Sequence, residues 1–223
     1  NVTLTFKPAL ANTGLAFKRV DLEGMPIIEA DACYVTNTQR GTCLEKNGVT
    51  IQTSEHVLAA LVGMDVDNVI LELNASEPPI MDGSSKFFVK AIEDAGIVEL
   101  DAFREEYVIT DVISYTDEES GSEILVMPCK EYQITAMVDF GTKVLGTQNA
   151  TLNKISDFKK DISNARTFSF LHEIEMLLEH GLIKGGDLNN AIVYVDKALS
   201  PETLEKLKVA FKKDSIAIKP NGI

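Results

Sequence analysis

Glu55 and His56 are adjacent residues whose side chains can transfer a proton and bind a metal ion. They follow Thr53 and Ser54, which can cap a helix predicted over 55–62. Neighbouring helical residues point about 100° apart, so both side chains can reach one spot beyond the helix N-terminus. A neutral imidazole can bind a metal there while the carboxylate takes a proton from a metal-bound water. On these two residues alone, a capping glutamate beside a surface histidine is the simpler interpretation.

The other two histidines do not complete a metal site by local motif. His172 and His180 lie eight residues apart, and the chain has no H-x-x-x-H, H-E-x-x-H or H-x-x-x-D spacing. His172 stands beside Glu173 and could take part in a site. Solvated positions on a helix are the simpler interpretation for both histidines.

A polar and aromatic block at 165–170, A-R-T-F-S-F, is a second candidate region. A hydroxyl there could donate to a developing oxyanion, and Phe168 and Phe170 could line an apolar channel. A strand edge with core phenylalanines explains the block equally well. The segment 78–84, P-P-I-M-D-G-S, is typical of a turn and helix start, and the Gly-Gly loop at 184–186 lacks a phosphate-binding pattern.

Composition excludes several classes of protein. The 223 residues include 34 acidic and 21 basic side chains, so the net charge is −13 and a nucleic-acid partner is not expected. No apolar run approaches the roughly 20 residues that span a bilayer, and no export signal opens the chain. Cys33, Cys43 and Cys129 form no C-x-x-C pair. We therefore expect a soluble, cytoplasmic protein with reduced thiols and no integral membrane segment.

The hydrophobic pattern predicts strands and helices in both halves of the chain. An Asn47-Gly48 hairpin turn is also expected. In the first half, the predicted strands are 2–6, 15–20, 26–32, 49–52 and 68–73, and the predicted helices are 55–62 and 84 or 85 to 95. In the second half, the predicted strands are 107–115, 123–127, 132–140 and 190–195, and the predicted helices are 155–164, 171–180 and 201–212.

A short internal similarity suggests a duplicated architecture. Residues 65–70, D-V-D-N-V-I, match residues 187–192, D-L-N-N-A-I, and each copy starts an apolar strand. Chance remains an alternative over six positions. The working hypothesis is an α+β protein with two related units, residues 1–101 and residues 102–223.

Four sequence blocks occur in one order along the chain. They are 53–61 (T-S-E-H-V-L-A-A-L), 67–84 ending in P-I-M-D-G-S, 165–168 (A-R-T-F), and 185–193 with Gly-Gly and then N-A-I-V. Together they resemble the zinc-dependent UDP-3-O-acyl-N-acetylglucosamine deacetylases of lipid A biosynthesis over essentially the whole chain. The E-H-x-x-A-A-L and P-I-M-D-G-S blocks are distinctive in combination.

The resemblance implies a fold, a reaction and roles for particular residues. The fold is two β-α-α-β units packed as a two-layer sandwich. The reaction is hydrolysis of the 2-acetamido group of a UDP-linked, acylated amino sugar, with release of acetate. By match of motif, Glu55 would be the general base, His56 a zinc ligand and Thr167 the oxyanion donor. Zinc would be the cofactor, although Fe(II) also suits such a site. Contacts to the substrate would come from Phe140, Phe168 and Phe170.

Three segments of the family pattern are missing, which qualifies this expectation. The family's H-K-x-x-D-x-x-G-D segment and its later Gly-His segment are absent, as is its early G-L-H-[ST]-G turn. We therefore expect a trimmed piece with an incomplete second unit, incomplete for activity and prone to associate. The alternatives are a catalytically inactive binding or regulatory module of the same fold, a different amide or ester hydrolase, and the deacetylase part of a fusion with an acyl carrier protein dehydratase.

Overall fold

The computed structural model describes residues 1–39, 41–179, 189–197 and 199–218. Helices and strands are mixed and the strands belong to several small sheets, which confirms the α+β class. The division at residue 101 and the two-layer sandwich stay predictions.

The largest sheet has four strands, in the order β1-β7-β2-β3. These are β1 (Leu4–Pro8), β7 (Val69–Leu73), β2 (Leu15–Arg19) and β3 (Ile27–Glu29). β7 pairs antiparallel with β1 and parallel with β2, and β2 pairs antiparallel with β3. A strand from late in the first half therefore lies between two early ones.

Alternation along β7 explains why one face of this sheet is covered. Val69, Leu71 and Leu73 are buried, whereas Glu72 points to the other face and accepts a hydrogen bond from Lys18 Nζ at 3.0 Å. Successive side chains of a strand point to opposite faces, so this sheet has one apolar face and one polar face.

Helices α1 (Glu55–Gly63) and α2 (Lys86–Ala95) bury their apolar stripes in the core with this sheet. Both match their predicted ranges closely. Gly96 ends α2 with φ +80°, a value that favours glycine. The buried residues of the two helices are Val57, Ala60, Leu61 and Gly63 on α1, and Phe88, Val89 and Ile92 on α2.

A second, three-stranded sheet precedes α1. It consists of β4 (Val35–Asn37), β5 (Cys43–Lys46) and β6 (Val49–Ile51), and a short 3₁₀ helix, η1 (Ala32–Tyr34), leads into it. Asn47 and Gly48 have φ +52° and +76° between β5 and β6, which confirms the expected hairpin turn. The sequence did not predict β4 and β5, because both strands are short and contain polar residues.

Strands in the second half form three separate two-stranded sheets within the described ranges. β8 (Ile113–Thr116) pairs with β9 (Glu123–Val126), and β10 (Ile134–Asp139) pairs with β11 (Thr147–Leu152). The strand predicted over 107–115 begins only at Ile113, and β11 was not predicted. β12 (Phe168–Phe170) and β13 (Ile192–Tyr194) pair in parallel.

The helices of the second half differ in part from the prediction. Residues 155–164 form a 3₁₀ turn, η2 (Ile155–Asp157), followed by the short α3 (Phe158–Asp161). The helix ends there because the Ser163 N–H donates to the Phe158 carbonyl, five residues back, and not to the Lys159 carbonyl.

α4 (Leu171–Glu179) and α5 (Pro201–Phe211) lie close to their predicted ranges, although residue 180 falls outside the described residues. Ser200 Oγ accepts a hydrogen bond from the Thr203 N–H at 3.0 Å and so caps α5. The two helices share a small core of Leu171, Ile174, Leu207 and Phe211.

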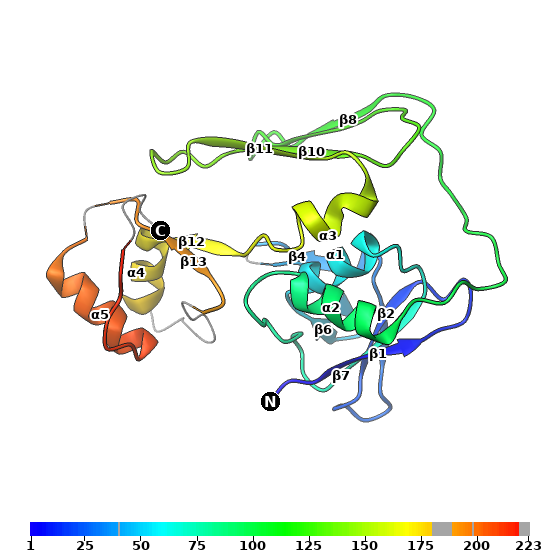
Figure 1. Cartoon of the computed structure of the whole chain (residues 1–223), viewed down its shortest axis with the longest axis horizontal. Helices are drawn as coiled ribbons and strands as arrows, with labels where there is room; N and C mark the ends of the chain where they lie inside the picture. Colours follow the sequence, from blue (N-terminus) through cyan, green and yellow to red (C-terminus); the bar gives the residue numbers. More distant parts are fainter. Residues whose placement is uncertain (40, 180–188, 198, 219–223) are drawn as a thin grey trace.

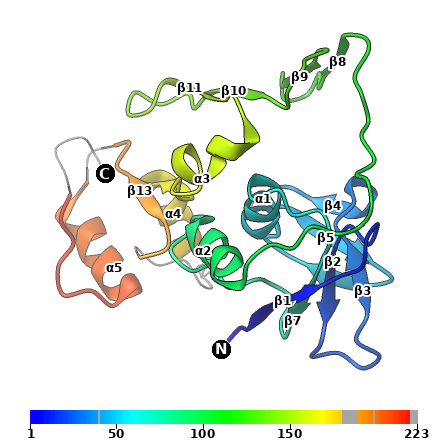
Figure 2. The same cartoon turned by 45° about the vertical axis from the view of Figure 1, so that its right-hand side comes forward.

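Figures 1 and 2 show how these parts are arranged. The four-stranded sheet lies at one end, with α1, α2 and α3 beside it, and α4 and α5 lie at the opposite end. The two hairpins run along one edge of the molecule. The segment that leads to them is anchored by Arg104, whose Nη2 lies 2.8 Å from Asp65 Oδ1 and 2.7 Å from Asp67 Oδ2. Among the described residues, no helix is both long and apolar enough to cross a bilayer.

The internal similarity is only partly visible. β7 begins at residue 69, whereas β13 begins at residue 192, which is one position later in the matched pattern. Residues 187 and 188 of the second copy lie outside the described part of the chain. A duplicated origin therefore stays a prediction.

The β8–β9 hairpin exposes an apolar face. The cross-strand pairs Ile113–Val126 and Tyr115–Ile124 share this face, and each of these four side chains is at least 36% exposed. Isolated hairpins are marginally stable in water, and exposed strand edges and apolar patches favour association.

We expect this 223-residue chain, produced alone, to self-associate at micromolar concentration. Ile113→Lys should lower the weight-average mass measured by sedimentation, because it places a charge on the apolar face. Ser114→Lys is the matched control on the opposite face of the same strand and should leave the mass unchanged. Monomeric sedimentation of the unmodified chain at these concentrations would contradict the expectation.

Candidate active site

Glu55 and His56 lie at the first turn of α1. Glu55 Oε2 accepts a hydrogen bond from the Thr42 N–H at 2.8 Å, and Glu55 Oε1 lies 3.9 Å from His56 Nε2. The Glu55 side chain is 38% exposed and the His56 side chain 22% exposed. The carboxylate is therefore held through one oxygen, while the other faces the imidazole.

Ser54 anchors this turn in a way that the sequence did not predict. Its side chain makes no cap bond to the helix; the fully buried hydroxyl instead donates to the Thr42 carbonyl at 2.9 Å. The Ser54 N–H donates to the same carbonyl at 3.1 Å. The expected side-chain cap by Ser54 is thus wrong, because the Ser54 backbone is already helical (φ −78°, ψ −18°) and not extended as in a capping residue.

Thr167 lies beside the segment that carries the P-I-M-D-G-S block. Its N–H donates to the Gly83 carbonyl at 2.7 Å, and its own carbonyl accepts from the Ile192 N–H at 3.0 Å. Two residues after Gly83, the Ser85 hydroxyl donates to the His56 carbonyl at 2.9 Å. These bonds link Thr167 to the Glu55-His56 turn through one short segment.

The three phenylalanines singled out in the sequence form one aromatic cluster. The ring centroids of Phe140 and Phe168 are 5.3 Å apart, those of Phe168 and Phe170 are 5.7 Å apart, and those of Phe140 and Phe170 are 6.2 Å apart. Tyr194 joins them at 5.5 Å from Phe168. Edge-to-face geometry of this kind is favourable for aromatic rings.

Sequence reasoning missed Tyr194 and His172 as members of this cluster. Tyr194 pairs with Phe170 in the parallel β12–β13 register, so a correct pairing of the two apolar strands would have revealed it. The His172 ring stacks on Phe170 with centroids 5.7 Å apart and planes 14° apart.

His172 also pairs with Asp196. The histidine Nδ1 hydrogen-bonds Asp196 Oδ2, and the His172 N–H donates to Asp196 Oδ1 at 3.4 Å. Burial acts to raise the pKa of Asp196, but hydrogen bonds from His172 and from the Asp196 backbone together outweigh it, so the pKa lies below its usual value. The neighbouring Glu173 is engaged elsewhere, because its Oε2 accepts from Ser169 Oγ and from the Phe170 N–H. The neighbouring side chains of His172 and Glu173 thus have different partners.

The described residues supply no group of three His, Cys, Asp or Glu side chains that could hold a metal ion. His56 is the one imidazole at the α1 turn within these ranges, and the closest acidic group is Glu55. A catalytic zinc needs three protein ligands. These residues alone therefore do not fit a zinc centre.

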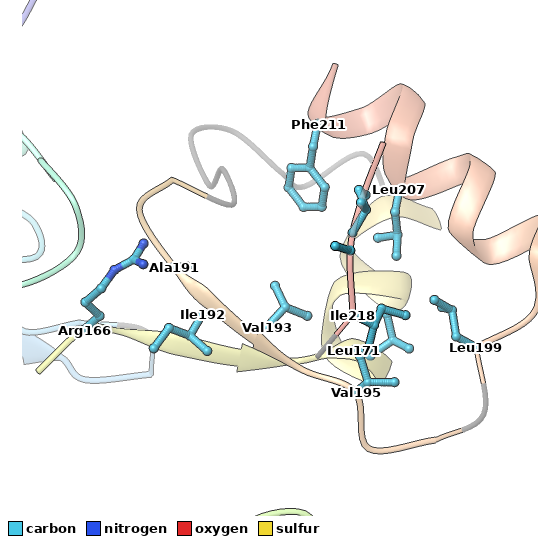
Figure 3. Close-up of a pocket in the computed structure, with 12 residues that line it drawn as sticks. Arg166, Leu171, Ala191, Ile192, Val193, Val195, Leu199, Leu207, Phe211 and Ile218 are labelled. Carbon is cyan, nitrogen blue, oxygen red and sulfur yellow. The ribbon is translucent and has the colours of Figure 1, made fainter. Parts of the chain in front are cut away.

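A cavity of about 210 Å³ lies between β13, α4, α5 and the segment 216–218. Figure 3 shows apolar side chains from these elements facing one another, among them the ring of Phe211, with Arg166 at the end where β12 begins. The cavity is the unfilled centre of the small core that α4 and α5 share.

Asp82 in the P-I-M-D-G-S segment has a pKa below its usual value. Burial acts to raise the pKa of Asp82, but hydrogen bonds from Lys86 and Ser84 outweigh this effect. The ionised form therefore stabilises the folded state above about pH 4, and this contribution is lost as pH falls through the lowered pKa.

We expect the difference in melting temperature between the unmodified chain and Asp82→Asn to be constant from about pH 5 to pH 8 and to shrink below about pH 4. Thermal unfolding followed by circular dichroism across this pH range would measure it. A difference that grows towards low pH would contradict the assigned direction of the pKa shift.

Comparisons with known proteins agree on one family. Residues 1–209 match the family model of LpxC, UDP-3-O-acyl N-acetylglycosamine deacetylase. A bifunctional enzyme LpxC/FabZ of Bacteroides thetaiotaomicron is 44% identical over 207 residues, which is 93% of this chain and 45% of that protein. The corresponding enzyme of Porphyromonas gingivalis shows the same identity and coverage.

A UDP-3-O-acyl-N-acetylglucosamine deacetylase of Myxococcus xanthus is 41% identical over 206 residues, which is 91% of this chain and 65% of that protein. The chain thus spans about half the length of the bifunctional relatives and about two thirds of the monofunctional one. The family match covers residues 1–209, a range that includes Glu55, His56 and Thr167. The chain belongs to the LpxC family of UDP-3-O-acyl N-acetylglycosamine deacetylases.

Proposed function

We propose that this chain carries catalytic residues of a hydrolase that removes the acetyl group from UDP-3-O-acyl-N-acetylglucosamine in lipid A biosynthesis. The observation that carries the proposal is the hydrogen-bonded connection between the Glu55-His56 turn and Thr167. A base and an oxyanion donor are the groups that hydrolysis of an amide requires.

Glu55 is the proposed general base. The Thr42 N–H holds one carboxylate oxygen, so the other is available to take a proton from an attacking water molecule. Thr167 is the proposed oxyanion donor, because its hydroxyl can stabilise the negative charge that develops on the acetyl oxygen. Family membership and the motif match support both roles.

The aromatic cluster is the proposed contact surface for the substrate. Phe140, Phe168 and Phe170 offer ring faces and edges to a ligand that has both a nucleobase and an acyl chain. The cluster begins at the residue that follows Thr167, so a substrate held there lies near the proposed oxyanion donor.

His56 is the proposed metal ligand on this chain, for zinc or Fe(II). One imidazole does not make such a centre, so the remaining ligands must come from outside the described residues. We assign no catalytic step to the metal. The two-unit sandwich, with its division at residue 101, is part of the same proposal, as is a cytoplasmic location.

Acetate release tests the proposal directly. Protein produced from its own gene should release acetate from UDP-3-O-acyl-N-acetylglucosamine, and a UDP-linked substrate analogue should compete. Metal analysis of the same preparation should find close to one zinc or iron per chain, and His56→Ala should reduce this value. A folded protein that binds the analogue without releasing acetate would favour a binding or regulatory module. Activity that the analogue does not inhibit would favour a different hydrolase.

A second candidate is that the whole protein is bifunctional. The observation that favours it is the similarity to bifunctional LpxC/FabZ enzymes at 44% identity. The intact mass of protein made from its own gene, with an assay for acyl carrier protein dehydratase activity, would decide between the two candidates.

A further inference from the structure

The P-I-M-D-G-S block has no role in the proposed chemistry, yet it joins the two parts of the site. Residues 82–85 contact the α1 turn on one side and the residues around Thr167 on the other. We infer that this segment sets the position of Thr167 relative to the Glu55-His56 turn, and that Gly83 and Arg166 are its positioning residues. The inference deepens the proposed function and rests on it for the role of Thr167.

The connection between the α1 turn and Thr167 is short, and each of its hydrogen bonds involves a backbone group. The buried Ser85 hydroxyl donates to the His56 carbonyl at 2.9 Å, and the Gly83 carbonyl accepts from the Thr167 N–H at 2.7 Å. Only Ser84, itself fully buried, lies between these two contact residues. A displacement of Gly83 therefore moves the Thr167 backbone with respect to α1.

Gly83 allows Asn190 and Thr167 to lie closer to the backbone than any other residue at this position would permit. A Cβ atom on Gly83 would lie 1.9 Å from the Asn190 carbonyl oxygen and 2.9 Å from Thr167 Cγ2. Its φ of +80° is also in the region that favours glycine. Any side chain here must push Asn190 and Thr167 away.

Arg166 holds the other side of this contact. Its Nε donates to the Asp82 carbonyl and its Nη2 to the Asn189 carbonyl, both at 2.6 Å. The planar guanidinium fixes these two donors in one rigid fork, which the single ammonium of lysine cannot reproduce. One side chain thus ties residue 82 to residue 189 directly beside Thr167.

Neither residue is proposed to contact the reacting atoms. Gly83 has no side chain, and the two Arg166 donors described above bond to backbone carbonyls. Their effect must pass through the position of Thr167. A misplaced oxyanion donor weakens transition-state stabilisation more than ground-state binding, so kcat should fall while KM changes little.

The experiment compares two glycines that have the same φ angle. Gly83 and Gly96 both have φ +80°, but a Cβ atom on Gly96 would meet nothing within 4 Å. In protein produced from its own gene, Gly83→Ala should lower kcat by about 10- to 100-fold with KM within about twofold. Gly96→Ala should leave both constants close to those of the unmodified protein.

Arg166→Lys and Arg166→Ala test the same contact without adding bulk, and they decide the matter if Gly83→Ala does not fold. We expect kcat to fall in the order unmodified protein, Lys variant, Ala variant. Hydrogen exchange gives a readout that does not depend on activity. The Thr167 and Ile192 amides should exchange at least about tenfold faster in Arg166→Ala, while the Leu71 amide in β7 should keep its rate.

A rise in KM at unchanged kcat in the Arg166 variants would overturn the inference, as would equal losses in the Gly83 and Gly96 variants. If the unmodified protein releases no acetate, the proposed function fails and hydrogen exchange alone decides the positioning claim. Faster exchange confined to Thr167 and Ile192 then supports it, and unchanged exchange at these amides overturns it.

Discussion

Glu55→Gln should reduce acetate release by about 10²- to 10⁴-fold in protein produced from its own gene. The amide keeps an oxygen that can accept the Thr42 hydrogen bond, so the local structure should persist. It cannot take a proton from water at neutral pH, so the proposed base is removed without a change in shape. Steady-state kinetics with UDP-3-O-acyl-N-acetylglucosamine would measure the effect on kcat.

Glu45→Gln is the matched control for this substitution. Glu45 lies in β5, where its side chain is exposed. The same chemical change at this position should alter neither kcat nor the melting temperature. If Glu55→Gln retained full activity at unchanged stability, Glu55 would not be the base.

Substitutions at the contact between α1 and α3 should have the largest effects on the free energy of unfolding. The ring of Phe158, which is 6% exposed, lies directly over Gly63, and a Cβ atom on Gly63 would fall 2.1 Å from Phe158 Cδ1. Phe158→Ala should cost about 3–5 kcal/mol of unfolding free energy, because a large buried ring is lost. Gly63→Ala should cost about 1–3 kcal/mol, because the ring must move. Urea denaturation would measure both values.

The double variant Gly63→Ala/Phe158→Ala tests whether the Phe158 ring is the reason that Gly63→Ala lowers stability. Alanine is about 1 kcal/mol better than glycine within a helix when nothing opposes it. In the Phe158→Ala background, Gly63→Ala should therefore become neutral or stabilising, a change of sign relative to the unmodified background. The same cost in both backgrounds would show that the ring is not what the new methyl group meets.

Much of the first half could be predicted from local sequence patterns. Helices α1 and α2, strand β7 and the Asn47-Gly48 turn depend on periodicity and turn chemistry within a few residues, which the sequence displays directly. β11 could not be predicted, because its T-Q-N-A-T-L sequence is largely polar and becomes a strand by pairing with β10. The roles of Glu55, His56 and Thr167 stay predictions that rest on motif and family.

The sequence by itself determined the α+β class, the family and the adjacency of Glu55 and His56 at a helix start. Only the tertiary structure decided how Thr167 reaches that turn, because the bonds between residues 83 and 167 and between residues 56 and 85 span long stretches of chain. It also decided that Tyr194 joins the aromatic cluster, since β12 and β13 pair across more than twenty residues. Periodicity and turn chemistry act between neighbours in the chain, whereas packing selects partners that are distant along it.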